Sequence, residues 1–260
     1  MIDINFVKDR RIDSEFSMKL ISSAINNKSP YSFVRMNDGE ADIIGAFREV
    51  DEERVRWRLN HWWGRSDYPV SDIEELREKL IISAESADIL CFFDDGDKTG
   101  GNYKRCGRFL RKYADLKQSQ HFSSPEIHYE WQSNDVIGSI VSGIDSITCI
   151  TCYDIASSVS DKFDIKNVHT INIPGHSKYS YSGEGENTHW PHRFRDIVSQ
   201  LSSPQNGHVY LVGAGVLGKY YCHIIKKYGG IAIDIGSVFD FWVGNEKRRS
   251  VKIGRSRVGI

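Results

Sequence analysis

The chain has no apolar run near the roughly 20 residues that a membrane-spanning helix needs. Residues 1–5 lack the basic and apolar regions of a signal peptide, which predicts a cytoplasmic location. The five cysteines are odd in number and irregularly spaced, so they do not resemble a disulfide framework and indicate a reducing compartment. With 34 basic and 35 acidic residues, the net charge of −1 gives no global attraction for nucleic acid.

What the chain does contain is apolar strands that alternate with helical patterns, over 260 residues that allow one large domain or two small ones. Residues 146–151 and 168–173 favour strands, and Ile155, Val159 and Phe163 between them have helical spacing. This predicts a βαβ unit, in which a helix joins two parallel strands. Residues 126–131 favour another strand, and residues 61–65 an aromatic loop.

The first motif that suggests chemistry is Ser32-Phe33-Val34-Arg35-Met36-Asn37-Asp38-Gly39-Glu40. It predicts a short apolar strand, a turn and a helix capped by Asp38. Asp38 and Glu40 would then lie at the carboxyl end of a strand, the edge where open α/β sheets bind ligands. Carboxylates there suit Mg²⁺ or Mn²⁺. The alternative is an ordinary solvated helix start, in which Glu40 complements the helix dipole.

Two other segments carry polar side chains suited to a site. A predicted strand at residues 87–93 leads into a loop with Asp94, Asp95 and Asp97, which is either a second part of the same edge or a solvated turn. Residues 174–190 form a long predicted loop that includes His176 and His189. Loops of this length are usually functional or disordered, and its side chains suit a ligand rich in hydroxyl groups.

The second strong motif is Gly213-Ala214-Gly215-Val216-Leu217-Gly218-Lys219, between a predicted strand and a predicted helix. Backbone N–H groups at such a turn, together with the helix dipole, favour a phosphate. With Asp234 on the next strand, the pattern also matches the dinucleotide fingerprint, so an NAD(P)- or flavin-dependent oxidoreductase is a rival interpretation. A nucleotide-binding module without catalytic activity is a third.

A nucleotide-sugar transferase accounts for both motifs, because a cation held by Asp38 and Glu40 would neutralise a diphosphate leaving group. The oxidoreductase leaves the acidic turn unexplained. It also expects further βαβ units after the fingerprint, for which little chain remains.

The same residues resemble a known family. The first part of the resemblance is Ser32-Phe33-x-Arg35-x-x-Asp38-Gly39-Glu40 with Ile43-Ile44-x-Ala46. The second part is Gly215-x-x-x-Lys219, the segment from Gly230 to Gly236, and Asp240. Both parts are similar to the signatures of the bacterial GT-D-fold glycosyltransferases. The resemblance implies one Rossmann-like domain over residues 1–260, with a mostly parallel sheet and helices on both faces. It also implies a UDP-sugar donor, Mn²⁺ or Mg²⁺, and a glycan acceptor in surface polysaccharide or glycoprotein synthesis.

Roles for single residues follow as expectations. Asp38 and Glu40 would bind the metal, and Arg35 would meet the diphosphate or pair with these carboxylates. The other residues expected to bind the nucleotide sugar are Gly213, Gly215, Gly218, Lys219, Asp234, Ser237 and Asp240. An inverting transfer needs a general base, for which the candidates are Asp95, Asp97, His176 and His189.

The chain ends in a basic tail from about residue 245. This tail would be a solvated end, or it would contact an anionic membrane surface at the inner face of the membrane. Such a contact would suit a lipid-linked acceptor. The sequence is compatible with a homodimer, and no nucleic-acid partner is expected.

Overall fold

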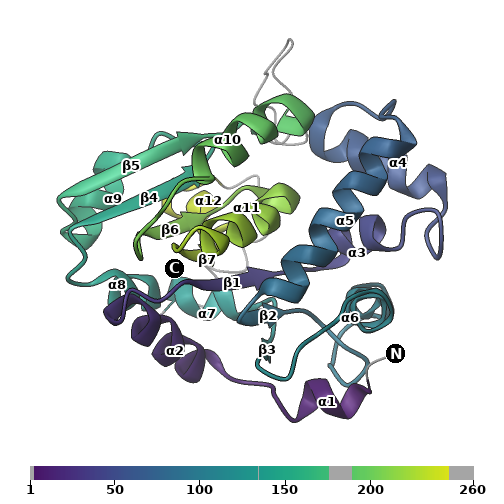
Figure 1. The fold of residues 1–260 in the computed structure, drawn as a ribbon, viewed down its shortest axis with the longest axis horizontal. Coiled ribbons are helices and arrows are strands. Elements are labelled where there is room, and N and C mark those ends of the chain that lie inside the picture. Colours follow the sequence, from purple (N-terminus) through teal and green to yellow (C-terminus); the bar gives the residue numbers. More distant parts are fainter. Residues whose placement is uncertain (1–2, 134, 176–188, 246–260) are drawn as a thin grey trace.

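Figure 1 shows the fold in a computed structural model that describes residues 3–133, 135–175 and 189–245. Its centre is a seven-stranded sheet in the order β3-β2-β1-β7-β6-β4-β5, and every neighbouring pair is parallel. The strands are β1 (Tyr31–Arg35), β2 (Ile89–Cys91), β3 (His121–Ser123), β4 (Ser146–Thr151), β5 (Asn167–Asn172), β6 (Val209–Val212) and β7 (Ile231–Asp234). The expected Rossmann-like parallel sheet is confirmed.

Helices lie on both faces of this sheet (Figure 1). They are α1 (Ile4–Lys8), α2 (Ser14–Asn26), α3 (Asp38–Ile44), α4 (Glu52–Trp63), α5 (Val70–Ser86), α6 (Gly101–Tyr113), α7 (Ile127–Ser133), α8 (Val136–Val141), α9 (Ala156–Phe163), α10 (Phe194–Leu201), α11 (Gly215–Lys227) and α12 (Val238–Trp242), with a π-helical turn η2 (His189–Arg193) before α10. None of the described helices is long and apolar enough to span a membrane.

Alternation along the strands divides the core into two layers, because successive side chains point to opposite faces. Val34 and Leu90 belong to the layer that includes buried residues of α3 to α6, α10 and α11. Phe33 and Ile89 belong to the other layer, with buried residues of α2, α7, α8 and α9. Most residues of every strand are buried except in the edge strand β5, whose residues are half-buried or exposed.

The predictions for three individual segments agree with the structure to different degrees. The helix start at Asp38 is correct to one residue, but the N-cap is Asn37, whose backbone N–H donates to the Glu40 carboxylate at 3.0 Å. Residues 126–131 are not a strand, because most of them lie in α7. Residues 61–63 are the last turn of α4 rather than a loop, and Gly64 ends that helix with a φ of +70°.

Candidate active site

A cleft lies at the carboxyl edge of the sheet, above the ends of β4, β5, β6 and β7. It holds about 540 Å³ of empty space when its open mouth is included. Among the residues that line it are several expected at the site: Gly213, Gly215, Ser237, Asp240 and His189. His176 and most of the loop at 174–190 lie outside the described residues.

Residues of the glycine turn line this cleft, and a different structural constraint favours glycine at each of its three glycine positions. A side chain at Gly213 would place its Cβ 2.9 Å from the Gly236 carbonyl oxygen, so the turn and the start of the α12 segment touch. Gly215 has a φ of +57°, in the region that favours glycine. A Cβ at Gly218 would lie 3.0 Å from Val212 Cγ1, so this glycine lets α11 pack closely on β6.

Two polar pairs line or border the cleft. The phenol of Tyr153, just after β4, donates to Asp240 Oδ1 at 2.7 Å. Asp240 is only 4% exposed. On another wall, His189 Nε2 lies 2.8 Å from the hydroxyl of Tyr221, a buried residue of α11. Burial raises the pKa of Tyr221 well above its usual value, so this phenol stays protonated.

Lys219 does not line the cleft. Its ammonium pairs with Asp234 and lies 3.7 Å from Glu40 Oε1, and all three side chains are buried. Burial disfavours the charged ammonium, but the Asp234 and Glu40 carboxylates more than offset this, so the pKa of Lys219 is raised. Lys219 therefore neutralises two internal carboxylates instead of presenting its charge to a phosphate.

The side chains of Asp234 and Arg35 are also engaged in contacts within the protein. The Asp234 carboxylate accepts hydrogen bonds from the backbone N–H groups of Arg35 and Gly236, both at 3.1 Å. The Arg35 guanidinium donates to the Pro125 carbonyl at 2.9 Å and lies beside His128. The Arg35 side chain thus joins β1 to the segment before α7 and pairs with neither Asp38 nor Glu40.

Asp38 is the more exposed member of the predicted metal pair. Its side chain is 37% exposed, and its Oδ2 accepts from Arg58 at 3.0 Å. One turn further along α3, Asp42 is fully buried and binds three guanidinium groups, those of Arg54, Arg58 and Arg105. Asp42 therefore joins α3 to α4 and α6, directly beneath Asp38.

Sequence reasoning missed Asp42, although a signal was present. Asp38 and Asp42 are four residues apart, as are Arg54 and Arg58, so each pair shares one helix face. Tyr153 was also missed, because it follows the predicted strand at residues 146–151 without belonging to a recognised motif.

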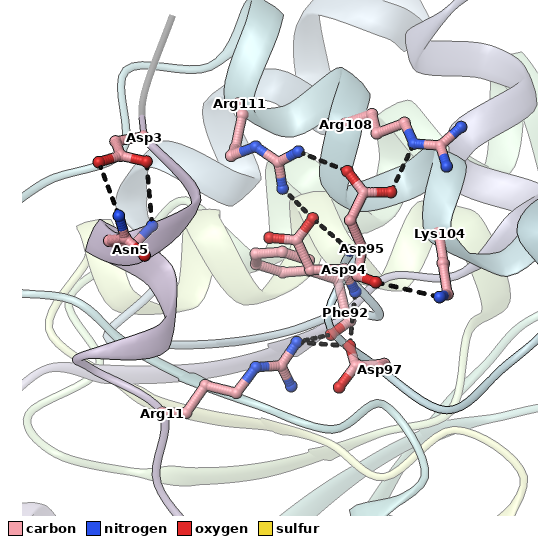
Figure 2. Close-up of polar contacts among 10 residues, drawn as sticks. All are labelled: Asp3, Asn5, Arg11, Phe92, Asp94, Asp95, Asp97, Lys104, Arg108 and Arg111. Atoms are coloured by element: carbon pink, nitrogen blue, oxygen red, sulfur yellow. Dashed lines mark hydrogen bonds and ion pairs between the residues drawn. The ribbon is translucent and has the colours of Figure 1, made fainter.

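Figure 2 shows where the structure places Asp95, a candidate base. The Asp95 carboxylate accepts from Arg108 at 2.7 Å and from Arg111 at 3.0 Å, and its carbonyl accepts from Lys104. Asp97 pairs in the same way with Arg11 at 2.7 Å. Neither aspartate lines the cleft.

Several arginines and lysines of α6 pair with acidic residues of this chain. Arg105 binds Asp42, and Lys112 binds Glu49. Together with the Asp94 and Asp95 contacts of Arg111, these pairs fasten α6 to the loops around it.

Thiol reactivity offers a direct check of the cleft. Cys152 lines it and is partly exposed, whereas burial raises the pKa of the other thiols, that of Cys149 to about 12. Because the thiolate is the reactive form, we expect one thiol per native chain to react rapidly with an aromatic disulfide reagent, and four slowly. Cys152→Ser should abolish the rapid phase. A rapid phase that survives this substitution would contradict the described burial.

No protein-family model and no curated protein matches this chain. Among the solved structures that resemble it are the following two. One, described as a new glycosyltransferase (DUF1792) from Streptococcus sanguinis, is 17% identical, with a TM-score of 0.52 over 89% of this chain and 85% of that one. The other, a domain of unknown function 1792, is 16% identical, with a TM-score of 0.50 over 90% and 86%. The chain shares the fold of these two structures.

Proposed function

We propose that this chain is a metal-dependent glycosyltransferase that moves a sugar from a nucleoside-diphosphate sugar, a UDP-sugar in the first instance, to a glycan or glycolipid acceptor. The observation that carries the proposal is the arrangement of the two motifs. Lys219 of α11 lies 3.7 Å from Glu40 of α3, so a buried ion pair joins the helix that bears Asp38 to the helix whose first turn lines the cleft, although Asp38 and Glu40 do not line the cleft themselves. The name of the similar structure from Streptococcus sanguinis supports the same activity.

In this proposal the diphosphate lies at the first turn of α11. The turn offers backbone N–H groups that the helix leaves without internal acceptors, and the helix dipole favours negative charge there. When the bond between the sugar and the diphosphate breaks, negative charge grows on the leaving oxygen. Donors already fixed in place stabilise that charge without reorganisation.

Asp38 fits a divalent cation better than Glu40 does. Its Oδ1 accepts no hydrogen bond from any described residue, and the side chain is partly exposed. Both oxygens of Glu40 face inward, toward the Asn37 N–H and Lys219. Mg²⁺ often takes one or two protein carboxylates and completes its shell with water and substrate phosphates. Asp38 would therefore hold Mn²⁺ or Mg²⁺ directly, which would neutralise diphosphate charge, and Glu40 would act through water or by fixing α3.

The test is metal-dependent release of nucleoside diphosphate across a panel of nucleotide sugars. We expect Asp38→Asn to lower the rate by about 10²–10³-fold, the cost of losing one group that stabilises developing charge. Its melting temperature should stay close to that of the wild type, because the pair with Arg58 is partly exposed. Asp67→Asn, at an exposed loop pair with Arg65, is the matched control and should leave the rate unchanged.

A panel without any metal-dependent release would refute the proposal, and binding without release would favour the non-catalytic module. NADH belongs in the same binding series, because the oxidoreductase remains the rival. The burial of Asp234 argues against the oxidoreductase. Asp234 is the acid that would bind the ribose of the cofactor, but it is 2% exposed and paired with Lys219.

The acceptor and the location are also proposals. An acceptor on a lipid carrier would place the enzyme at the inner face of the membrane, where the basic tail would meet anionic headgroups. Residues 246–260 of that tail lie outside the described part of the chain, as does any surface of a homodimer that they contribute.

A further inference from the structure

In a dinucleotide-binding fold, an acid near the end of the second strand accepts a hydrogen bond from the ribose. Here the residue in that position, Asp234, points inward and receives Lys219 and two backbone N–H groups. The next acid along the chain is Asp240, on α12, and it is the one carboxylate among the described residues that line the cleft. Asp240, six residues after Asp234, is therefore the candidate acid for binding the ribose.

The Asp240 carboxylate is held in a fixed orientation. Tyr153 donates to its Oδ1 at 2.7 Å. The Asn245 side-chain amide lies 2.9 Å from the Tyr153 hydroxyl and 3.4 Å from the same Oδ1, and the Asn245 backbone N–H donates to the Asp240 carbonyl at 2.8 Å. These contacts come from the β4–α9 turn and from the residues just after α12, and both side chains reach Oδ1. They fix the orientation of the carboxylate.

The glycine turn lies close to this carboxylate. Phe239, the residue before Asp240, packs directly against Gly213, and a Cβ at Gly213 would also lie 2.9 Å from the Gly236 carbonyl. Gly213, Gly215 and Asp240 line the same cleft. A ligand with its phosphates on the first turn of α11 would therefore bring the sugar next to the phosphates within reach of α12.

We propose that Asp240 accepts hydrogen bonds from the ribose hydroxyls of the donor nucleotide, and that Tyr153 is a positioning residue that orients the carboxylate. The inference rests on the proposed function and adds that the ribose is the part of the donor that lies next to α12. A vicinal diol offers two O–H donors, and a carboxylate is an acceptor only, so the site distinguishes a ribonucleotide from its 2′-deoxy form.

The experiment compares the dissociation constants of UDP and 2′-deoxy-UDP by calorimetry in the presence of Mn²⁺. A hydrogen bond to a charged group contributes about 1.5–3 kcal/mol, so the wild type should prefer UDP by about 10–150-fold. Asp240→Ala should weaken UDP binding and bring this ratio to about 1. Tyr153→Phe, which removes only the phenol oxygen, should reduce the ratio severalfold while the protein stays folded.

Asp145→Ala is the matched control, because Asp145 is an exposed acid beside the amino end of β4, paired with Lys166. It should keep the wild-type ratio. Equal wild-type affinities for the two nucleotides, or an unchanged ratio in Asp240→Ala, would overturn the ribose assignment while leaving the transferase proposal in place. Failure of the wild type to bind either nucleotide would overturn the ribose assignment together with the choice of a UDP-sugar as donor.

Discussion

Replacing Lys219 by methionine is expected to lower the free energy of unfolding by about 3–5 kcal/mol, the cost of leaving buried charges without their partner. Methionine has a similar length, so little packing is lost, but Asp234 and Glu40 would keep two carboxylates in the core near 2% and 8% exposure. Urea denaturation at pH 7 measures the change. The effect is large because one ammonium serves both acids.

Lys226→Met is the matched control, since Lys226 pairs with Asp88 at 2.8 Å in a half-buried position at the opposite edge of the sheet. A loss of about 1 kcal/mol is expected there. Adding Glu40→Gln and Asp234→Asn to Lys219→Met should recover part of the lost stability. If Lys219→Met costs no more than Lys226→Met, the two carboxylates do not depend on Lys219.

The pH dependence of this contribution has a definite sign. The pKa of Lys219 is raised above 10.5 in the folded protein, so the folded state holds the proton more tightly than the unfolded chain. The stabilisation is therefore complete below about pH 10.5 and declines as the pH rises through the higher pKa of the folded state. The difference between wild type and Lys219→Met should shrink over that alkaline range.

The second large effect is expected for Asp42→Asn, again about 3–5 kcal/mol of unfolding free energy. Asp42 is fully buried, and its two oxygens receive Arg54 at 3.0 Å, Arg58 at 2.7 Å and Arg105 at 2.8 Å. An asparagine has the same shape, but it removes the charge and turns an N–H₂ group toward a guanidinium. Urea denaturation is again the measurement.

Asp38→Asn tests whether burial decides the size of this effect. Asp38 shares Arg58 with Asp42 but is 37% exposed, so its replacement should cost less than about 1 kcal/mol. The two variants should then separate stability from activity. Asp42→Asn should lower stability strongly, whereas Asp38→Asn should stay folded and lose metal-dependent release. Similar losses of stability in both variants would contradict the described burial.

The parallel sheet could be predicted because its strands are short apolar runs separated by helical patterns with clear turn residues. Parallel strands end at one edge, so the sequence also placed Asp38, Gly213 and Asp240 on the same side of the molecule. The error at residues 126–131 has a simple cause. Ile127 and Trp131 are both buried and four residues apart, which is helical spacing, and the Trp131 ring packs 4.6 Å from that of Phe33.

The directions of the charged side chains could not be predicted. Lys219 follows a glycine turn, which suggests a phosphate ligand, but its partners are Asp234 at the end of the next strand, β7, and Glu40 of α3, near the start of the chain. The same holds for Asp95, whose loop suggested a base until α6 placed Arg108 and Arg111 against it. Local patterns report the backbone, whereas ion pairs of this kind depend on which elements the fold brings together.

The pairing of β1 with β7 has a consequence for how such an enzyme would enclose its substrates. These two strands hydrogen-bond along three registered positions, and the Lys219 contacts join the segments just beyond them. Backbone hydrogen bonds and a buried ion pair thus connect the segment that bears Asp38 to the strands that end at the cleft. If the enzyme closes over a bound donor, we expect segments outside the sheet to move.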